Sequence, residues 1–183
     1  MNISLTDLQD VSIIENPPFE DHRGSFSRLF CKNDLAGVIG NREVLQVNYS
    51  CTSKVGTIRG LHYQLPPNSE FKMVRCLRGR VWDVVVDLRN GSPTFLQWHA
   101  EELTPENGRM LVIPEGCAHG FQVLEAESEL LYLHTAYYSP SSEGGIRFDE
   151  PRLEIRWPLP VVDVSERDLC HQLMLPDYSG IIL

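Results

Sequence analysis

The sequence predicts an all-β protein, a sandwich or barrel of short strands with a few short helices. Three observations lead to this fold class: β-branched or alternating stretches recur along the chain, Gly and Pro turns separate them, and helical periodicity is almost absent. A chain of 183 residues is of a size that forms one domain with a sizeable core. We therefore expect residues 1–183 to fold as a single domain.

The composition narrows the class of function. The formal net charge of −9 argues against general binding to nucleic acid or to an anionic membrane. No apolar run is long enough to span a bilayer, and the first residues lack the pattern of a signal peptide. The five cysteines are scattered and odd in number, which is typical of reduced thiols. We expect a cytoplasmic protein with no membrane or nucleic-acid partner.

The N-terminal part of the chain is mixed in pattern. Residues 1–20 contain two consecutive prolines and predict an extended segment that reaches across another part of the protein. Residues 21–26 predict a turn that leads into a strand. Residues 33–41 predict one short helix, because Asn33 can cap its start and a Gly-Asn pair can end it.

From residue 44 onward the pattern is that of strands. Leu45, Val47, Tyr49 and Cys51 alternate with polar residues, which indicates a strand with one apolar and one polar face. The polar face carries Gln46, Asn48 and Ser50. This face either meets solvent or lines a wet pocket.

Residues 56–79 predict a strand, a loop and a second strand, punctuated by glycines and a proline pair. Arg59, His62 and Lys72 lie close together in this stretch. If the three side chains point the same way, the two cations favour the neutral form of the imidazole, which can then accept a proton. The alternative is a surface histidine beside two solvated basic residues.

The second half of the chain continues the alternation of strands and turns. A Ser-x-x-Asp pattern at Ser165–Asp168 predicts a helix start, and the proline-rich residues 140–160 predict loops that cover the strands. The expected strands are 80–87, 97–103, 110–113, 121–124 and 130–137.

Two segments resemble the paired sequence motifs of the cupin superfamily. They are Gly56-x5-His62 and Gly108-x5-Pro114-x-Gly116-x2-His119. The resemblance implies a cupin-type jelly-roll barrel. Metal-binding cupins carry a second histidine two positions after the first, and here that position is Gln64. Because catalytic metals usually have three protein ligands, we expect no metal and no other cofactor, although the spacing leaves Glu70 and Cys117 as conceivable ligands.

A longer series of segments resembles the dTDP-4-dehydrorhamnose 3,5-epimerase family in order and spacing, from about residue 15 to about residue 170. Each segment is weak alone, and the ordered set is specific. The segments are Asp21-x-Arg23-Gly24-x-Phe26, Arg59-Gly60-Leu61-His62-Tyr63-Gln64, Lys72-x-Val74-Arg75, Ile113-Pro114-Glu115-Gly116-x-Ala118-His119-Gly120-Phe121, Tyr137-Tyr138-Ser139-Pro140, Ile155-x-Trp157-Pro158 and Ser165-x-x-Asp168.

The resemblance implies an isomerase that acts on a nucleotide-diphospho-4-keto-6-deoxy sugar, in the biosynthesis of deoxysugars for lipopolysaccharide O-antigen or other cell-surface polysaccharide. The protons at C3 and C5 are acidic because each is alpha to the C4 ketone. Inversion at either centre needs a base on one face, an acid on the other, and stabilisation of the enolate between them.

The matching positions imply a role for each group. His62 would be the base, Asp168 would hold its ring in the useful tautomer, and Tyr132 would return a proton from the opposite face. Lys72 would place positive charge near the enolate oxygen. Further substrate-binding positions are Arg59, His119, Gln46 and Asn48.

Each of these residues also has a purely structural interpretation. His119 could brace a turn, Asp168 could cap a helix, and Tyr132 could be an ordinary aromatic residue of a strand. Lys72 could be a solvated lysine. The joint agreement of all four positions with one family favours the catalytic interpretation.

The resemblance also implies a homodimer whose N-terminal strands cross to the partner. Arg23, Phe26 and Phe19 would then contact the nucleotide in the other subunit's pocket. Tyr138 and Glu143 match positions at the pocket mouth.

The chain departs from the family pattern near the nucleotide. Arg28 and Ala136 stand where acidic residues are usual. A changed charge at this end leaves CDP- or GDP-linked sugars open beside dTDP-linked ones. The alternatives to an epimerase are a catalytically inactive cupin module that binds sugar nucleotides and a metal-dependent cupin enzyme.

Overall fold

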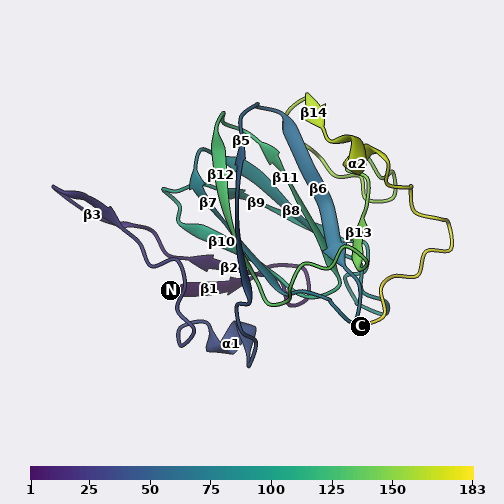
Figure 1. Ribbon diagram of the computed structural model, residues 1–183, viewed down its shortest axis with the longest axis horizontal. Coiled ribbons are helices and arrows are strands. Elements are labelled where there is room, and N and C mark those ends of the chain that lie inside the picture. The colour runs from purple at the N-terminus through teal and green to yellow at the C-terminus, as the bar shows by residue number, and fades with distance from the viewer.

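The computed structural model describes residues 1–183 and consists mainly of two sheets that face each other (Figure 1). In spatial order the first sheet holds β1 (Asn2–Leu5), β2 (Ser12–Glu15), β10 (Arg109–Ile113), β7 (Lys72–Arg78), β12 (Ser128–His134) and β5 (Gln46–Thr52). The second holds β13 (Glu143–Gly145), β6 (Thr57–Gln64), β11 (Cys117–Val123), β8 (Val81–Asp87) and β9 (Trp98–Leu103). β14 (Asp163–Val164) runs parallel to β6, and the other pairings in these sheets are antiparallel. The all-β jelly-roll barrel predicted from the sequence is confirmed.

The main core lies between the two sheets. Its members come from alternate positions of the strands, as the period of two requires. Each fully buried aliphatic side chain of this kind contributes about 1.5–3 kcal/mol through the hydrophobic effect. Central examples are Val74, Val85, Leu111, Phe121 and Leu130.

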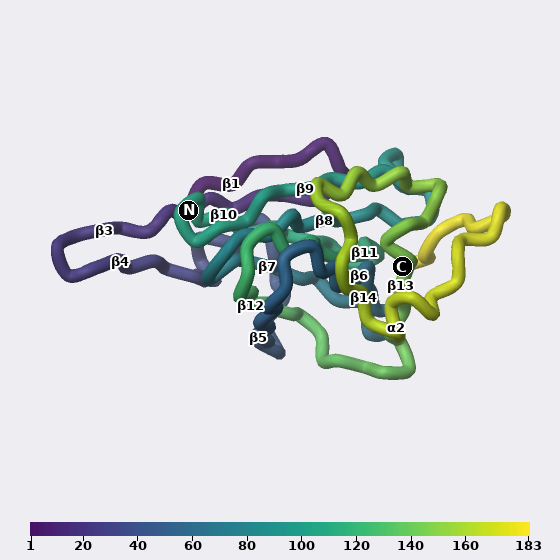
Figure 2. The backbone as a smooth tube through the Cα atoms, turned by 90° about the horizontal axis from the view of Figure 1, so that it is seen from above, coloured from purple at the N-terminus to yellow at the C-terminus, as the bar shows by residue number.

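A small hairpin leaves the body of the barrel near the N-terminus. It consists of β3 (Phe19–Asp21) and β4 (Gly24–Phe26), which pair only with each other. Figure 2 shows it projecting well away from the two sheets. Its two phenylalanines are 70% and 74% exposed within the single chain. Exposure of two large aromatic side chains on one projecting element is typical of an interaction surface.

The short helix expected at residues 33–41 is present in reduced form. Helix α1 covers only Ala36–Ile39, and its N-cap is Leu35, which makes no side-chain cap. The expectation that Asn33 caps the helix is wrong, because the chain before Ala36 forms turns instead. Gly40 ends the helix as expected, with a φ of 59° that an L-residue adopts with strain.

Two strand boundaries differ from the expectation. The strand expected at 121–124 begins earlier, at Cys117, because residues 117–120 also pair with β8 although their sequence shows no clear alternation. The strand expected at 130–137 ends at His134, where the pairing of β12 with both neighbouring strands stops.

The C-terminal segment returns across the second sheet. Helix α2 (Glu166–Leu169) begins at Ser165, whose hydroxyl accepts a hydrogen bond from the backbone N–H of Asp168 at 3.1 Å. The helix start predicted from Ser-x-x-Asp is therefore confirmed. The helix packs beside β6 and aims Asp168 at it. No helix in the chain has the length and apolar character needed to cross a membrane.

Candidate active site

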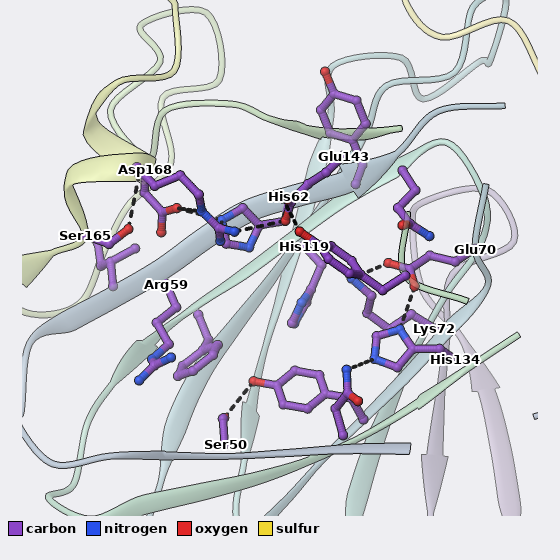
Figure 3. A pocket seen from close by; sticks show the side chains of 18 of the residues that line it. Ser50, Arg59, His62, Glu70, Lys72, His119, His134, Glu143, Ser165 and Asp168 are labelled. Atoms are coloured by element: carbon purple, nitrogen blue, oxygen red, sulfur yellow. Dashed lines mark hydrogen bonds and ion pairs between the residues drawn. The ribbon is translucent and has the colours of Figure 1, made fainter. Parts of the chain in front are cut away.

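A cavity of about 640 Å³ opens between the two sheets, within the size range of small-molecule sites. Strands β5, β7 and β12 of the first sheet form one wall, and β6 and β11 of the second sheet form the other. Figure 3 shows His62 and Asp168 on one side of it and Ser50 and His134 on another. The segments α2 and β13 close part of the mouth.

Most of the site residues expected from the sequence meet in this cavity. The polar face of β5 points inward, so the polar residues that alternate along this strand line the pocket. The expected residues that line the cavity are Gln46, Asn48, Arg59, His62, Lys72, His119, Tyr132, Tyr138, Glu143 and Asp168. The remaining three, Phe19, Arg23 and Phe26, line a separate shallow pocket on the projecting hairpin.

His62 and Asp168 form a close pair across 106 positions of sequence. Nε2 of His62 lies 2.7 Å from Oδ1 of Asp168, and Oδ2 of the same carboxylate accepts the N–H of Gly60 at 3.1 Å. Burial raises the pKa of Asp168, but the hydrogen bonds from His62 and Gly60 outweigh it and hold that pKa well below its usual range. An ionised carboxylate only accepts, so Nε2 carries the proton and Nδ1 keeps its lone pair.

Backbone packing brings these two groups together. Gly60 has a φ of 124°, and a Cβ there would lie 2.5 Å from Cα of Gly120 on the neighbouring strand. Only glycine fits this position, and its buried N–H donates to the carboxylate of Asp168.

A cation lies beside the histidine. Nη2 of Arg167 is 3.0 Å from Nε2 of His62, and Nη1 pairs with Glu143 at 3.0 Å. Glu143 also accepts the hydroxyl of Tyr138 at 2.9 Å. Because a guanidinium carries donors only, Arg167 accepts no hydrogen bond from the ring and places positive charge beside it. A continuous series of polar contacts thus runs from Tyr138 at the mouth of the cavity through Glu143 and Arg167 to His62.

A second histidine lies beside the first, on the neighbouring strand of the same sheet. His119 pairs in register with His62, and its Nε2 lies 2.9 and 3.0 Å from the two carboxylate oxygens of Asp83. Both side chains are buried, and burial lowers the pKa of His119 despite the neighbouring carboxylate. His119 lies in the middle of β11 rather than at a turn, so its ring belongs to the cavity wall.

The opposite wall carries the tyrosine and the lysine. The hydroxyl of Tyr132 is 3.0 Å from that of Ser50 on β5. Burial raises the pKa of Tyr132, so the phenol is protonated at neutral pH and can act as a proton donor. Nζ of Lys72 on β7 pairs with Glu70 at 2.9 Å.

Several cavity residues were missed by sequence reasoning. Ser50 was expected on the polar face of its strand but was not named as a site residue, and neither was His134; both continue the inward alternation of their strands, so period two was a usable signal for both. Asp83 and Arg167 gave no signal, because their roles depend on contacts with residues far away in sequence. Glu70 was considered only as a metal ligand, whereas here it pairs with Lys72.

One group of residues around His62 has the composition of a metal site. Ligand atoms of His62, Asp168 and His171 lie within 4.8 Å of one another. The guanidinium of Arg167 lies next to the same histidine nitrogen, however, and its positive charge opposes a cation there. The geometry therefore suits a base held by a carboxylate better than a metal centre.

Comparisons with known proteins agree with this geometry. The chain matches the sequence model of the dTDP-4-dehydrorhamnose 3,5-epimerase family over residues 5–175. A dTDP-4-dehydrorhamnose 3,5-epimerase of Shigella flexneri is 42% identical over 173 residues, which cover 94% of this chain and 95% of that protein. One of Salmonella typhimurium is 41% identical over 175 residues, covering 95% and 96%.

Solved structures give the same result. The crystal structure of dTDP-6-deoxy-D-glucose-3,5-epimerase from Legionella pneumophila, in complex with dTDP-4-keto-L-rhamnose, superposes with a TM-score of 0.89 at 41% identity, covering 94% of this chain and 92% of that one. A 3'-monoepimerase from Streptomyces bikiniensis in complex with dTDP-quinovose superposes with a TM-score of 0.83 at 30% identity, covering 92% and 85%. Matched in sequence over nearly its whole length and in fold throughout, the chain belongs to the dTDP-4-dehydrorhamnose 3,5-epimerase family.

Proposed function

We propose that this enzyme epimerises a dTDP-linked 4-keto-6-deoxy sugar at C3 and C5. The observation that carries the proposal is the position of a base and an acid on opposite walls of one cavity. His62 lies on β6 of the second sheet, and Tyr132 lies on β12 of the first. A sugar ring between the sheets presents one face to each of them, which is the arrangement that inversion requires.

The proposed reaction uses the lone pair on Nδ1 of His62. This nitrogen removes the proton alpha to the C4 ketone, and Asp168 stabilises the imidazolium that forms. The enolate oxygen is stabilised by the ammonium of Lys72. Tyr132 then delivers a proton to the opposite face of the same carbon. An inactive binding module needs neither the acid nor the base.

The diphosphate and nucleotide occupy the rest of the cavity in this proposal. Arg59, Gln46 and Asn48 supply donors to the diphosphate, and the buried His119 shapes the sugar subsite. Tyr138 and Glu143, joined by a hydrogen bond, lie at the nucleotide end.

We also propose a homodimer in which the hairpin of one copy completes the cavity of the other. The exposed Phe19 and Phe26 and the cationic Arg23 suit contact with a nucleotide base and a phosphate. Arg28 pairs with Asp34 of its own chain at 3.2 Å, next to this hairpin.

A cytoplasmic location is supported by five unpaired cysteines.

The reaction needs no metal in this account. Dialysis against a strong chelator is expected to leave kcat and KM unchanged, because Arg167 supplies charge where a cation would otherwise lie. Activity that falls on dialysis and returns with one divalent metal would contradict this expectation.

The experiment that tests the function supplies dTDP-, CDP- and GDP-linked 4-keto-6-deoxy sugars in heavy water. Deuterium at both C3 and C5 of the dTDP-sugar, with inversion at both centres, is the expected result. Uptake at C3 alone would indicate a monoepimerase, as the Streptomyces bikiniensis protein is described. Absence of exchange from every sugar would favour the binding module, and faster exchange from a CDP- or GDP-sugar would correct the nucleotide.

A further inference from the structure

The cavity contains a third pair of a histidine and a carboxylate, beside those of His62 and His119. Nδ1 of His134 lies 2.6 Å from Oε2 of Glu70, and Nζ of Lys72 lies 2.9 Å from Oε1 of the same carboxylate (Figure 3). The three side chains are only 9–12% exposed. The proton transfers proposed above use neither His134 nor Glu70, so the pair has no assigned task.

A chain of hydrogen bonds leads from this pair to the mouth of the cavity. The backbone N–H of Tyr138 donates to Oε1 of Gln46 at 3.0 Å. Nε2 of Gln46 donates to Oδ1 of Asn48 at 3.1 Å. Nδ2 of Asn48 lies 3.3 Å from Nε2 of His134, whose other nitrogen meets Glu70.

The direction of this chain is fixed at both ends. A backbone N–H can only donate, so Gln46 must present its oxygen to Tyr138 and its amide nitrogen to Asn48. Asn48 must then present its own amide nitrogen to His134, so Nε2 of that ring must accept. At the other end Glu70 only accepts, which requires a proton on Nδ1. All the bonds are satisfied together only by neutral His134 in the Nδ1–H tautomer.

This orientation determines what the two amides offer to a ligand. The NH2 group of Gln46 uses one hydrogen in its bond to Asn48, and the NH2 group of Asn48 uses one in its bond to His134. One N–H on each of the two residues is left without a partner. Gln46 and Asn48 both line the cavity. Two spare donors side by side match the oxygens of a diphosphate, which at neutral pH only accept.

From this geometry we propose that His134 and Glu70 are positioning residues, which hold Gln46 and Asn48 with their N–H groups toward the substrate diphosphate, and that protonation of His134 disrupts this orientation. The proposal rests on the proposed function for the identity of the ligand. It adds a specific task for a pair of residues that the proton transfers do not require.

Protonation acts through the same hydrogen bonds. Doubly protonated His134 donates from both nitrogens, so Asn48 must turn its oxygen toward the ring. Gln46 must then turn its oxygen toward Asn48, and its amide nitrogen meets the backbone N–H of Tyr138, donor against donor. The chain of bonds can no longer be completed, and the amides lose their fixed orientation.

The groups around His134 act on its charge in opposite directions. Glu70, from the loop before β7, favours the imidazolium. Lys72, which pairs in register with His134 across β7 and β12, opposes it. Tyr132 stacks on the ring at a centroid distance of 6.1 Å, and the amide of Asn48 reaches it from β5, both without charge.

The tautomer can be measured directly on the resting enzyme. Nitrogen-15 NMR of protein labelled at its six histidines, assigned with His134→Gln, reports which ring nitrogen carries the proton. At pH 8 we expect neutral His134 with the proton on Nδ1. A proton on Nε2, or a doubly protonated ring at pH 8, would overturn the proposal.

The effect on binding can be measured with dTDP-glucose, which lacks the 4-keto group and whose diphosphate stays ionised from pH 5.5 to 8.5. Calorimetry should show affinity falling as His134 is protonated, by about tenfold, because two hydrogen bonds to a charged ligand lose their alignment. In His134→Gln, which offers an amide oxygen to Asn48 and does not titrate, this pH dependence should disappear.

The matched control is His99→Gln, which removes another histidine near a glutamate, outside the cavity. It should keep the pH dependence of the parent. An equal pH dependence in His134→Gln and the parent would refute the proposal. If His134→Gln does not fold, the NMR measurement on the parent decides the question. The signals of the His134 ring are then assigned with the variant Glu70→Gln. Because both readouts use the resting protein, absent turnover would count against the proposed function and not against this arrangement.

Discussion

Asp168 receives hydrogen bonds from two segments of the chain, and each has a separate consequence. The bond from His62 fixes the tautomer of the base, and the bond from the N–H of Gly60 fixes the carboxylate itself. Because these bonds hold the pKa of Asp168 well below its usual range, the group stays ionised wherever the enzyme is folded and active. The orienting group is therefore constant while His62 gains and loses a proton.

The variant Asp168→Asn should change the orientation of the His62 ring and leave substrate binding largely intact. An amide can turn either its oxygen or its NH2 toward His62, so the ring is no longer held with its lone pair on Nδ1. We expect kcat to fall on the order of 10²–10⁴-fold, as when a histidine base loses its orienting carboxylate, with KM changed by a few-fold only. The control Asp177→Asn changes an exposed carboxylate in the C-terminal segment and should behave as the parent. Parental kcat in Asp168→Asn would exclude the role given to Asp168.

Glu70 should make stability depend on pH. Burial raises its pKa, but His134 and Lys72 outweigh burial and lower that pKa to about 2. A lowered pKa means that the stabilisation is present in full above the pKa of the unfolded chain, and is lost as pH falls toward about 2. Between pH 7 and pH 3 the parent should therefore lose about 2 kcal/mol more stability than Glu70→Gln.

Urea unfolding at the two pH values, at one protein concentration, measures this difference. Glu106→Gln, which changes an exposed glutamate without an ion pair, should lose as much as the parent. Equal losses in Glu70→Gln and the parent would mean that His134 and Lys72 do not stabilise the ionised carboxylate.

The residue types of the site were predictable from the sequence, whereas most of their partners were not, and Asp168 was expected beside His62 only through the family resemblance. The alternation of Gln46 and Asn48 predicted a polar face that meets solvent or lines a pocket, the family resemblance favoured the pocket, and both residues line the cavity. Asp83 lies in a strand of buried β-branched residues and reads as one more member of that strand. Its bond to His119 depends on the register of β8 against β11, which no local pattern encodes.

At the scale of elements, the hairpin of β3 and β4 has the clearest testable consequence. Its two strands do not pair with any other strand of the chain, and its exposed apolar surface is typical of an interaction site. Sedimentation of the parent at micromolar concentration should give twice 20.8 kDa. The double variant Phe19→Ser with Phe26→Ser should lose dimer, and its affinity for dTDP-glucose should fall about tenfold or more, with an unchanged circular dichroism spectrum.

A matched control is Ile182→Ser, which removes an apolar side chain that is 78% exposed at the C-terminus. It should leave the dimer intact. A parental protein that sediments as an active monomer would contradict the dimer, and a dimeric hairpin variant with parental affinity would place the hairpin outside the nucleotide site.

Strands were easier to predict than helices in this chain. Apolar–polar alternation located β5, and runs of β-branched and other apolar residues indicated β7 and β8, which are buried at nearly every position. Helix α1 is a single turn fixed by packing of Leu35 and Ile39, so capping signals misplaced its start. Helix α2 was predictable, since its Ser-x-x-Asp start is a local hydrogen bond.

For the whole molecule, the order of strands in two sheets creates the site. β6 carries the proposed base and β12 the proposed acid, and the sheets hold them on facing walls. The alternation of residues gives the face of each strand but not its neighbours, so the sequence alone placed these residues together only through resemblance to a family. The C-terminal segment adds Asp168 from beyond both sheets.

The central proposal is that His62 on one wall is the base and Tyr132 on the opposite wall is the acid, and exchange in heavy water tests it. His62→Ala cannot form the enolate, so a dTDP-4-keto-6-deoxy sugar should gain no deuterium. Tyr132→Phe can still form it, and His62 can return a solvent deuteron to the same face. Labelled but uninverted sugar is therefore expected, with inverted product reduced on the order of 10²-fold or more. Mass spectrometry and proton NMR of the recovered sugar give both readouts. Parental inversion by Tyr132→Phe, or parental deuterium uptake by His62→Ala, would contradict the account.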